Sequence, residues 1–311
     1  MRAALPLLFV CLALLFARTP LAALRSGLDG EAHASVEGDA FPRVLRDDVL
    51  DATFTLPRPP QRILSLTLAS DVLLARLVPL ERIVGVTSLV DVESYSSAVG
   101  QYPASIPRVR ANAETILALE PDLVIVASYS SPETVRMLVS AGIPVLRLFE
   151  VTTLDDVETS ARLLSRATGA DEAFLALAAE LQQAEARVAQ LHAFGAPPRV
   201  LFLSADGYTH GEGTLMDDML RAAGGTNVAR ELHLRGHQRA PLEAVIAASP
   251  EVILVPAMSD VEAARTLDMA MPLLRGALPH ARIASLPPRA LETTTIEVLQ
   301  AVPQLHDAIA P

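Results

Sequence analysis

Three arginines and a tyrosine–histidine pair are the side chains of this sequence best suited to binding a small ligand. Arg108 and Arg110 lie close together, and Arg239 lies in the second half of the chain. A guanidinium group binds a carboxylate through two parallel hydrogen bonds, so these arginines indicate an anionic ligand. Tyr208 and His210 are separated by one residue, and both residue types can ligate iron. Each is also a common hydrogen-bonding residue of surface loops, so both roles stay open.

The motifs of common enzyme classes are missing from the sequence. No G-x-G-x-x-G follows the first predicted strand, and neither G-x-x-x-x-G-K-[ST] nor G-x-S-x-G occurs anywhere. The segment 210–213 (HGEG) is too short for a catalytic signature and is more typical of a loop. We therefore expect a binding protein without a cofactor, and not an enzyme. The alternative from another class is an exported α/β enzyme such as a chelatase.

The placement of histidine argues against a site for a bare metal ion. A zinc site shared by two halves of a protein needs several histidines together with a carboxylate. No histidine lies between His33 and His192, so the first half supplies none. We expect no metal site made by the protein alone.

Composition limits the class of partner. Of the 311 residues, 51% are hydrophobic and 20% are charged, which is typical of a compact protein with a sizeable core. The formal net charge is −11, which argues against a nucleic-acid partner.

Residues 1–23 have the pattern of an export signal. Arg2 gives a positive start, an apolar run extends from Leu5 to Ala17, and small residues follow at 22 and 23. This order is typical of a cleavable signal peptide, and the run is short for a membrane-spanning helix. Cys11, the only cysteine, lies inside the run without the small residues of a lipoprotein signal before it. We expect a periplasmic protein, with an uncleaved anchor as the alternative.

The rest of the chain alternates between two kinds of segment. Residues 24–53 are expected to form a flexible leader and an N-terminal hairpin, the leader reaching residue 40. Beyond them, continuous Val/Ile/Leu runs alternate with amphipathic segments, which predicts parallel α/β sheets covered on both faces. Predicted strands cover 62–66, 82–87, 122–127, 143–149, 199–204, 251–256 and 282–286. Predicted helices cover 70–77, 113–119, 133–140, 214–223, 242–248 and 294–309.

A long helix is predicted in the middle of the chain. Residues 171–194 contain neither glycine nor proline, and their apolar residues fall at helical spacing. The segment 195–198 (GAPP) then ends the helix. We therefore expect two α/β lobes, 54–170 and 195–311, joined by this helix.

The two halves contain an internal echo. The segment from Glu114 to Val126 matches the segment from Glu243 to Val255, with glutamate, alanine, proline and valine recurring in register. Each copy predicts a short helix, a turn marked by proline and a buried strand. Proline often follows helices, so this pattern alone is common, but the matching glutamate is not explained in that way.

Several short motifs occur in the order of a known family. They are PQRI (60–63), RIVGV (82–86), the segment 114–126 and GGTNV (224–228). Together with the long helix they resemble the periplasmic binding proteins for ferric siderophores, haem and cobalamin. The resemblance covers residue 43 to the C-terminus. It implies a class III fold, with two Rossmann-like lobes joined by a single long helix and a ligand between them.

The resemblance also implies a function. It is that of the solute-binding subunit of an ABC importer, a monomer that captures a metal chelate and delivers it to a permease with its ATPase. It implies that Glu114 and Glu243, one on each lobe, dock onto arginines of the permease. Two carboxylates on a rigid body would fix the register of docking. They are alternatively ordinary solvated residues at helix starts, favoured by the helix dipole.

The expected ligand site follows from the same resemblance. Loops after the carboxyl ends of the strands should line it. Related cobalamin binders use aromatic residues there, including tryptophan, and this chain has no tryptophan. Ferric siderophore or haem is therefore favoured, with cobalamin as the alternative. Tyr208 or His210 would ligate a metal only if the ligand is haem. The expected ligand-binding residues are Arg108, Arg110, Tyr129, Tyr208, His210, His237 and Arg239.

Overall fold

The computed structural model describes residues 34–110 and 112–311. The expected signal peptide, 1–23, and the first part of the expected leader lie outside the described residues. Among the described residues, no helix combines the length and apolarity needed to span a bilayer.

A small antiparallel sheet opens the described chain. It consists of β1 (Ala34–Glu37), β2 (Arg43–Asp47) and β3 (Ala52–Leu56), in that order. The expected leader, 24–40, therefore ends too late, because its last part pairs as β1 with β2. Alternate residues of β1, Ala34 and Val36, are buried, and a four-residue strand shows too little alternation to be recognised from sequence.

The first large sheet is fully parallel, as predicted. Its order is β5-β4-β6-β7, formed by Ile83–Gly85, Ile63–Ser65, Leu123–Ala127 and Val145–Leu148. Every residue of β4 and β6 is buried, because helices cover both faces. The helices of this N-terminal lobe are α1 (Leu68–Leu77), α2 (Ala113–Ala118), α3 (Pro132–Ser140) and α4 (Leu154–Thr168).

The second large sheet repeats this arrangement. Its order is β10-β8-β12-β13, formed by Thr226–Asn227, Arg199–Phe202, Val252–Pro256 and Arg282–Leu286, all parallel. A separate hairpin pairs β9 (Tyr208–His210) with β11 (His237–Arg239). The helices of this C-terminal lobe are α6 (Leu215–Ala222), α7 (Val228–Glu231), α8 (Leu242–Ala248), α9 (Asp260–Ala270), α10 (Leu274–Ala277), α11 (Pro288–Leu291) and α12 (Ile296–Ile309).

The internal echo is confirmed in detail. Both sheets place their strands in the order second, first, third, fourth along the chain, and the echoed segments are α2–β6 and α8–β12. Glu120 and Ser249, which precede the matching prolines, both have a left-handed backbone, with φ of 45° and 52°. Non-glycine residues rarely adopt this conformation, so its recurrence at equivalent positions indicates one repeated unit.

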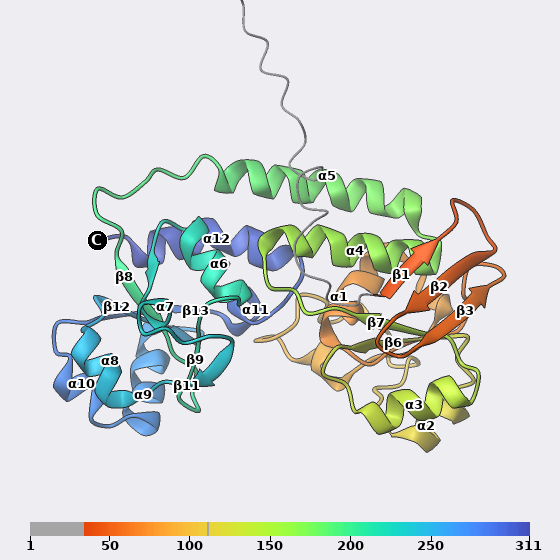
Figure 1. Ribbon diagram of the computed structural model, residues 1–311, viewed down its shortest axis with the longest axis horizontal. Helices are drawn as coiled ribbons and strands as arrows, with labels where there is room; N and C mark the ends of the chain where they lie inside the picture. Colours follow the sequence, from red (N-terminus) through yellow and green to blue (C-terminus); the bar gives the residue numbers. More distant parts are fainter. Residues whose placement is uncertain (1–33, 111) are drawn as a thin grey trace, which may run out of the picture. The chain divides into compact units, whose positions relative to one another are not determined.

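The connecting helix, α5 (Asp171–Val188), is shorter than the 171–194 predicted. It buries Phe174, Leu177, Leu181 and Ala184, and the chain beyond Val188 has no fully buried residue until Pro198. Without a buried face the last turns gain nothing from packing, which is the main source of helix stability in proteins. In Figure 1, α5 lies beside α4 and α12, and these three helices pack against one another.

Alternation along the strands divides the core. In β6, Leu123 and Ile125 face a shared core that also contains the buried sides of α4, α5 and α12, whereas Val124 and Val126 face a smaller core of their own lobe. In β12 the same alternation sends Leu254 to the shared core. Each sheet is thus held on one face by the shared core and on the other by its own helices.

A buried ion pair fastens the small sheet to the N-terminal lobe, and it gives a stability prediction. Asp47, 1% exposed, accepts hydrogen bonds from Arg147 Nε at 2.9 Å and Nη2 at 3.2 Å. Asp47→Asn removes the charge that balances the buried guanidinium, so we expect the free energy of unfolding to fall by about 3 kcal/mol in urea titrations. Asp48→Asn, at the exposed neighbour, should change it by no more than about 0.5 kcal/mol. Equal effects of the two substitutions would contradict the assignment.

Candidate functional site

A pocket of about 390 Å³ is lined by residues of both lobes. On the N-terminal side, Thr67, Tyr129 and Glu150 each lie two residues beyond the end of β4, β6 and β7 respectively. On the C-terminal side the polar lining consists of His210, His237, Glu292, Thr293 and Thr294. The carboxyl ends of parallel strands are the usual ligand site of open α/β sheets, and the volume falls in the range of small-molecule sites.

Two histidines of the hairpin contact each other in this pocket. His210 in β9 pairs in register with His237 in β11, and their ring centroids lie 4.2 Å apart, edge to face. Phe202 lies on the other side of His210, at 4.4 Å between centroids. Burial, followed by the nearby His237, lowers the pKa of His210 to about 4. His210 is therefore neutral at pH 7 and retains a lone pair for a ligand or a metal centre.

A tight backbone contact sets the position of the hairpin. The amide of Gly211 donates to the carbonyl of Gly236 at 2.9 Å. A Cβ at position 211 would lie 2.1 Å from the carbonyl oxygen of Leu234, so only glycine fits there.

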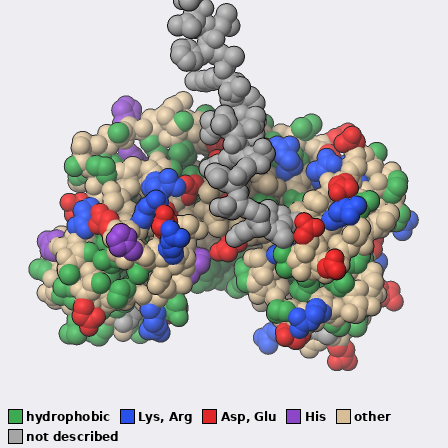
Figure 2. All heavy atoms as spheres, viewed as in Figure 1, with side chains coloured by type: hydrophobic (Ala, Val, Ile, Leu, Met, Phe, Trp, Pro, Cys, Tyr) green, Lys and Arg blue, Asp and Glu red, His purple; other side chains and the backbone are tan. Residues whose placement is uncertain are grey.

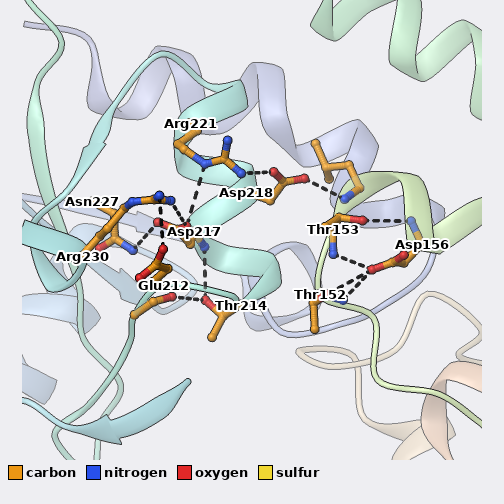
Figure 3. Close-up of polar contacts among 12 residues, drawn as sticks. Thr152, Thr153, Asp156, Glu212, Thr214, Asp217, Asp218, Arg221, Asn227 and Arg230 are labelled. Atoms are coloured by element: carbon orange, nitrogen blue, oxygen red, sulfur yellow. Dashed lines mark hydrogen bonds and ion pairs between the residues drawn. The ribbon is translucent and has the colours of Figure 1, made fainter. Parts of the chain in front are cut away.

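Asp217, in α6, supports the β9–β11 hairpin through side-chain contacts. It is 2% exposed and accepts hydrogen bonds from Asn227 Nδ2 and Arg230 Nη1, both at 3.0 Å (Figure 3). Asn227 Nδ2 also donates to the carbonyl of His210 at 3.0 Å. Arg230 reaches Glu212 as well, at 3.4 Å. The backbone of His210 is thus anchored to the first turn of α6.

The next residue of α6 connects the two lobes. Asp218 accepts a hydrogen bond from the amide of Leu154, the first residue of α4, at 2.9 Å. The start of α4 also has a capping box between Thr153 and Asp156, and Arg221 binds Asp218 from the other side (Figure 3). Adjacent aspartates therefore position the pocket hairpin and tie α6 to the N-terminal lobe.

Two carboxylates in the pocket were not among the sequence candidates. Glu150 lies 3.8 Å from Nε2 of His237, across the two lobes. Partial removal from water, together with the charge of Asp206, raises the pKa of Glu292. The rule that ligands bind beyond strand ends would have found Glu150, because it follows β7 as Tyr129 follows β6. Glu292 follows the short helix α11, and the sequence offered no comparable signal for it.

Arg108, one of the expected ligand-binding residues, is not among the residues that line the pocket and holds its own loop instead. Its Nε and Nη2 each donate to Asp91 at 2.7 Å. Its Nη1 donates to the carbonyls of Pro103 and Ile106, and Nη2 also donates to that of Tyr102. All five N–H donors of a guanidinium are accounted for by these contacts. The side chain holds its own loop and has no donor left for a ligand.

The other two arginines and Tyr208 also lie outside the pocket lining. Arg110 is exposed, and Arg239 pairs in register with Tyr208 and stacks over its ring at 5.4 Å. Of the seven expected ligand-binding residues, the structure brings Tyr129, His210 and His237 together. Tyr129 is 86% exposed, so most of its ring is available to a ligand.

The two echoed glutamates occupy equivalent sites. Glu114 is the second residue of α2 and Glu243 the second residue of α8, and both are exposed. Neither lines the pocket. In the space-filling view, acidic and basic side chains are interspersed over the face shown (Figure 2).

Within the described ranges, 34–110 and 112–311, no group of three or more His, Cys, Asp or Glu residues is placed to hold a metal ion.

Comparisons with known proteins agree with this architecture. Residues 63–272 match the sequence model of a protein family that is described as periplasmic binding protein. A cobalamin-binding protein of Halobacterium salinarum is 28% identical over 228 residues, which cover 71% of this chain and 60% of that protein's length. YvrC of Bacillus subtilis, described as an uncharacterized ABC transporter substrate-binding lipoprotein, is 24% identical, with 96% of each chain covered.

Solved structures of periplasmic binding proteins have a similar fold. The periplasmic heme-binding protein RhuT from Roseiflexus sp. RS-1, in its apo form, superposes with a TM-score of 0.63 and 27% identity, covering 80% of this chain and 97% of that one. The predicted fold and the predicted resemblance are both confirmed. The family model spans the first large sheet, α5 and all strands of the second large sheet except β13, and on this evidence the chain belongs to the family of periplasmic binding proteins.

Proposed function

We propose that this chain is the solute-binding subunit of an ABC importer, working in the periplasm, which captures a metal chelate between its two lobes and passes it to the permease. The pocket, lined by the strand ends of the first large sheet and by the hairpin, α6 and the segment after α11 of the C-terminal lobe, carries this proposal. Binding proteins of such importers capture and release a ligand without chemical change, so no catalytic step is needed.

The side chains around the pocket suit a metal macrocycle. Tyr129, Phe149, His210 and His237 supply rings, and Met216 adds a polarisable apolar surface. Neutral His210 is able to face a metal centre with its free lone pair. Haem and cobalamin, which the names of two similar proteins specify, are both metal macrocycles. A ferric siderophore also carries a metal centre.

The exposed glutamates support delivery to a partner. Glu114 and Glu243 recur at the same position of a duplicated unit, and neither is used by the pocket or by the fold. We propose that they dock onto arginines of the permease. Surface charges of this kind mainly set register and encounter rate, and so they need not contribute to ligand capture.

Titration with haem, cobalamin and a ferric siderophore tests the capture of a chelate. We expect saturable binding of at least one of them. The binding would be measured by the quenching of tyrosine fluorescence or by a change in the absorbance of the ligand. His210→Ala should weaken binding of that ligand about 10- to 100-fold, as for one lost contact worth about 1.5–3 kcal/mol. His192→Ala, at an exposed histidine outside the pocket, should leave the affinity unchanged. Absence of binding by all three ligands would overturn the proposal.

A double substitution separates delivery from capture. Glu114→Ala with Glu243→Ala should leave ligand affinity and stability unchanged, because both side chains are exposed and outside the pocket. Uptake by cells should fall sharply, and substitution by lysine should lower it further, since it sets like charges against each other. The control is Glu172→Ala, at the second residue of α5 and also exposed. Normal uptake by the double variant would rule out docking through these glutamates.

A further inference from the structure

The charges around the pocket are unbalanced. Glu150 and Glu292 line it, and none of the described lining residues is an arginine or a lysine. The 25 basic residues of the chain are all arginines, so guanidinium groups are its only permanent side-chain cations. An anionic ligand in this pocket would therefore meet two carboxylates and no permanent positive charge.

The arginines nearest in sequence to the pocket loops have other roles. Arg147, in β7, binds Asp47 of β2 in the small sheet at 2.9 Å. Arg239, in β11, stacks over Tyr208. Arg289, two residues before Leu291 of the lining, donates from its Nη1 to the carbonyl of Glu93 at 3.0 Å. Moving any of these three arginines to a ligand would break a contact that the fold already makes, so none offers a low-cost counter-ion.

The histidines do not reverse this balance. His210 is neutral at pH 7. His237 lies 3.8 Å from Glu150, so it faces one of the two carboxylates and not the open pocket alone. The described pocket lining therefore contains no permanent positive charge.

We propose that Glu150 and Glu292 make the pocket selective for chelates without free carboxylates, whose periphery carries amides or other hydrogen-bond donors. The carboxylates accept hydrogen bonds from such donors, whereas a propionate or a carboxylate of the chelate would lose its hydration beside a like charge. The proposal rests on the proposed capture of a chelate. It replaces the anionic ligand that the arginines suggested by a neutral or cationic one, such as an amide-bearing corrinoid.

One matched pair of ligands isolates this effect. An iron porphyrin with two free propionates and the same porphyrin with both converted to amides differ in charge and donors but share ring and metal. The protein purified from its own host should bind the diamide at least about 10-fold more tightly than the diacid at pH 7. In the double variant Glu150→Gln and Glu292→Gln this ratio should fall to about one to three, through tighter binding of the diacid.

Control measurements keep the outcomes distinct. Glu133→Gln with Glu172→Gln removes the same charge at exposed positions outside the pocket and should leave the ratio unchanged. Circular dichroism confirms that each variant is folded. A diacid bound as tightly as the diamide by the wild-type chain would overturn the charge selectivity while leaving chelate capture in place. Failure of both porphyrins, of cobalamin and of the ferric siderophore to bind would overturn the proposed function itself, and the selectivity with it.

Discussion

The shared core beneath α4, α5 and α12 is the constraint on which the rest of the structure depends. Alternate residues of β6 and β12 enter this one core. The first sheet contacts α4 and the second contacts α12, and both helices pack against α5. The carboxyl ends of the first large sheet and the β9–β11 hairpin of the C-terminal lobe then contribute to a single pocket. Contacts outside the core add to this, since Asp218 of α6 accepts from the first amide of α4. A change in pocket width must therefore repack α4, α5 and α12 or break the contact of Asp218, which favours small movements on ligand binding.

The polar groups of the chain divide into those that build loops and those that remain for a ligand. Arg108 is fully used by Asp91 and by three carbonyl groups, and this contact also holds the pKa of Asp91 below its usual value. Asp217 is buried beneath the hairpin and is matched by Asn227 and Arg230. What remains in the pocket is a set of rings, hydroxyls and two carboxylates. The charge of the pocket thus depends on which charged side chains already form ion pairs elsewhere in the fold.

Much of the fold could be predicted from sequence because its signals are local. The strand predicted at 251–256 is β12 (Val252–Pro256), and the helix predicted at 242–248 is α8. The helix α4 was not predicted, although a capping box at Thr153 and a glycine at 169 marked its two ends. The hairpin of β9 and β11 could not be predicted, because its three-residue strands are 26 residues apart and carry no alternation of their own.

The site was less predictable than the fold for a physical reason. A residue type shows which contacts are possible, but Arg108 shows that the fold can use every donor before a ligand arrives. The echo of Glu114 and Glu243 was visible because duplication preserves spacing. The pairing of His237 with Glu150 was not visible, since it joins loops of different lobes.

Anomalous diffraction can locate a metal chelate between the two lobes. Crystals of the protein with a bound chelate would be measured at the absorption edge of the chelate's metal. We expect one strong anomalous peak inside the pocket, bounded by Tyr129, Glu150 and His210. A peak outside this pocket, or a fully occupied ligand elsewhere on the protein, would contradict it.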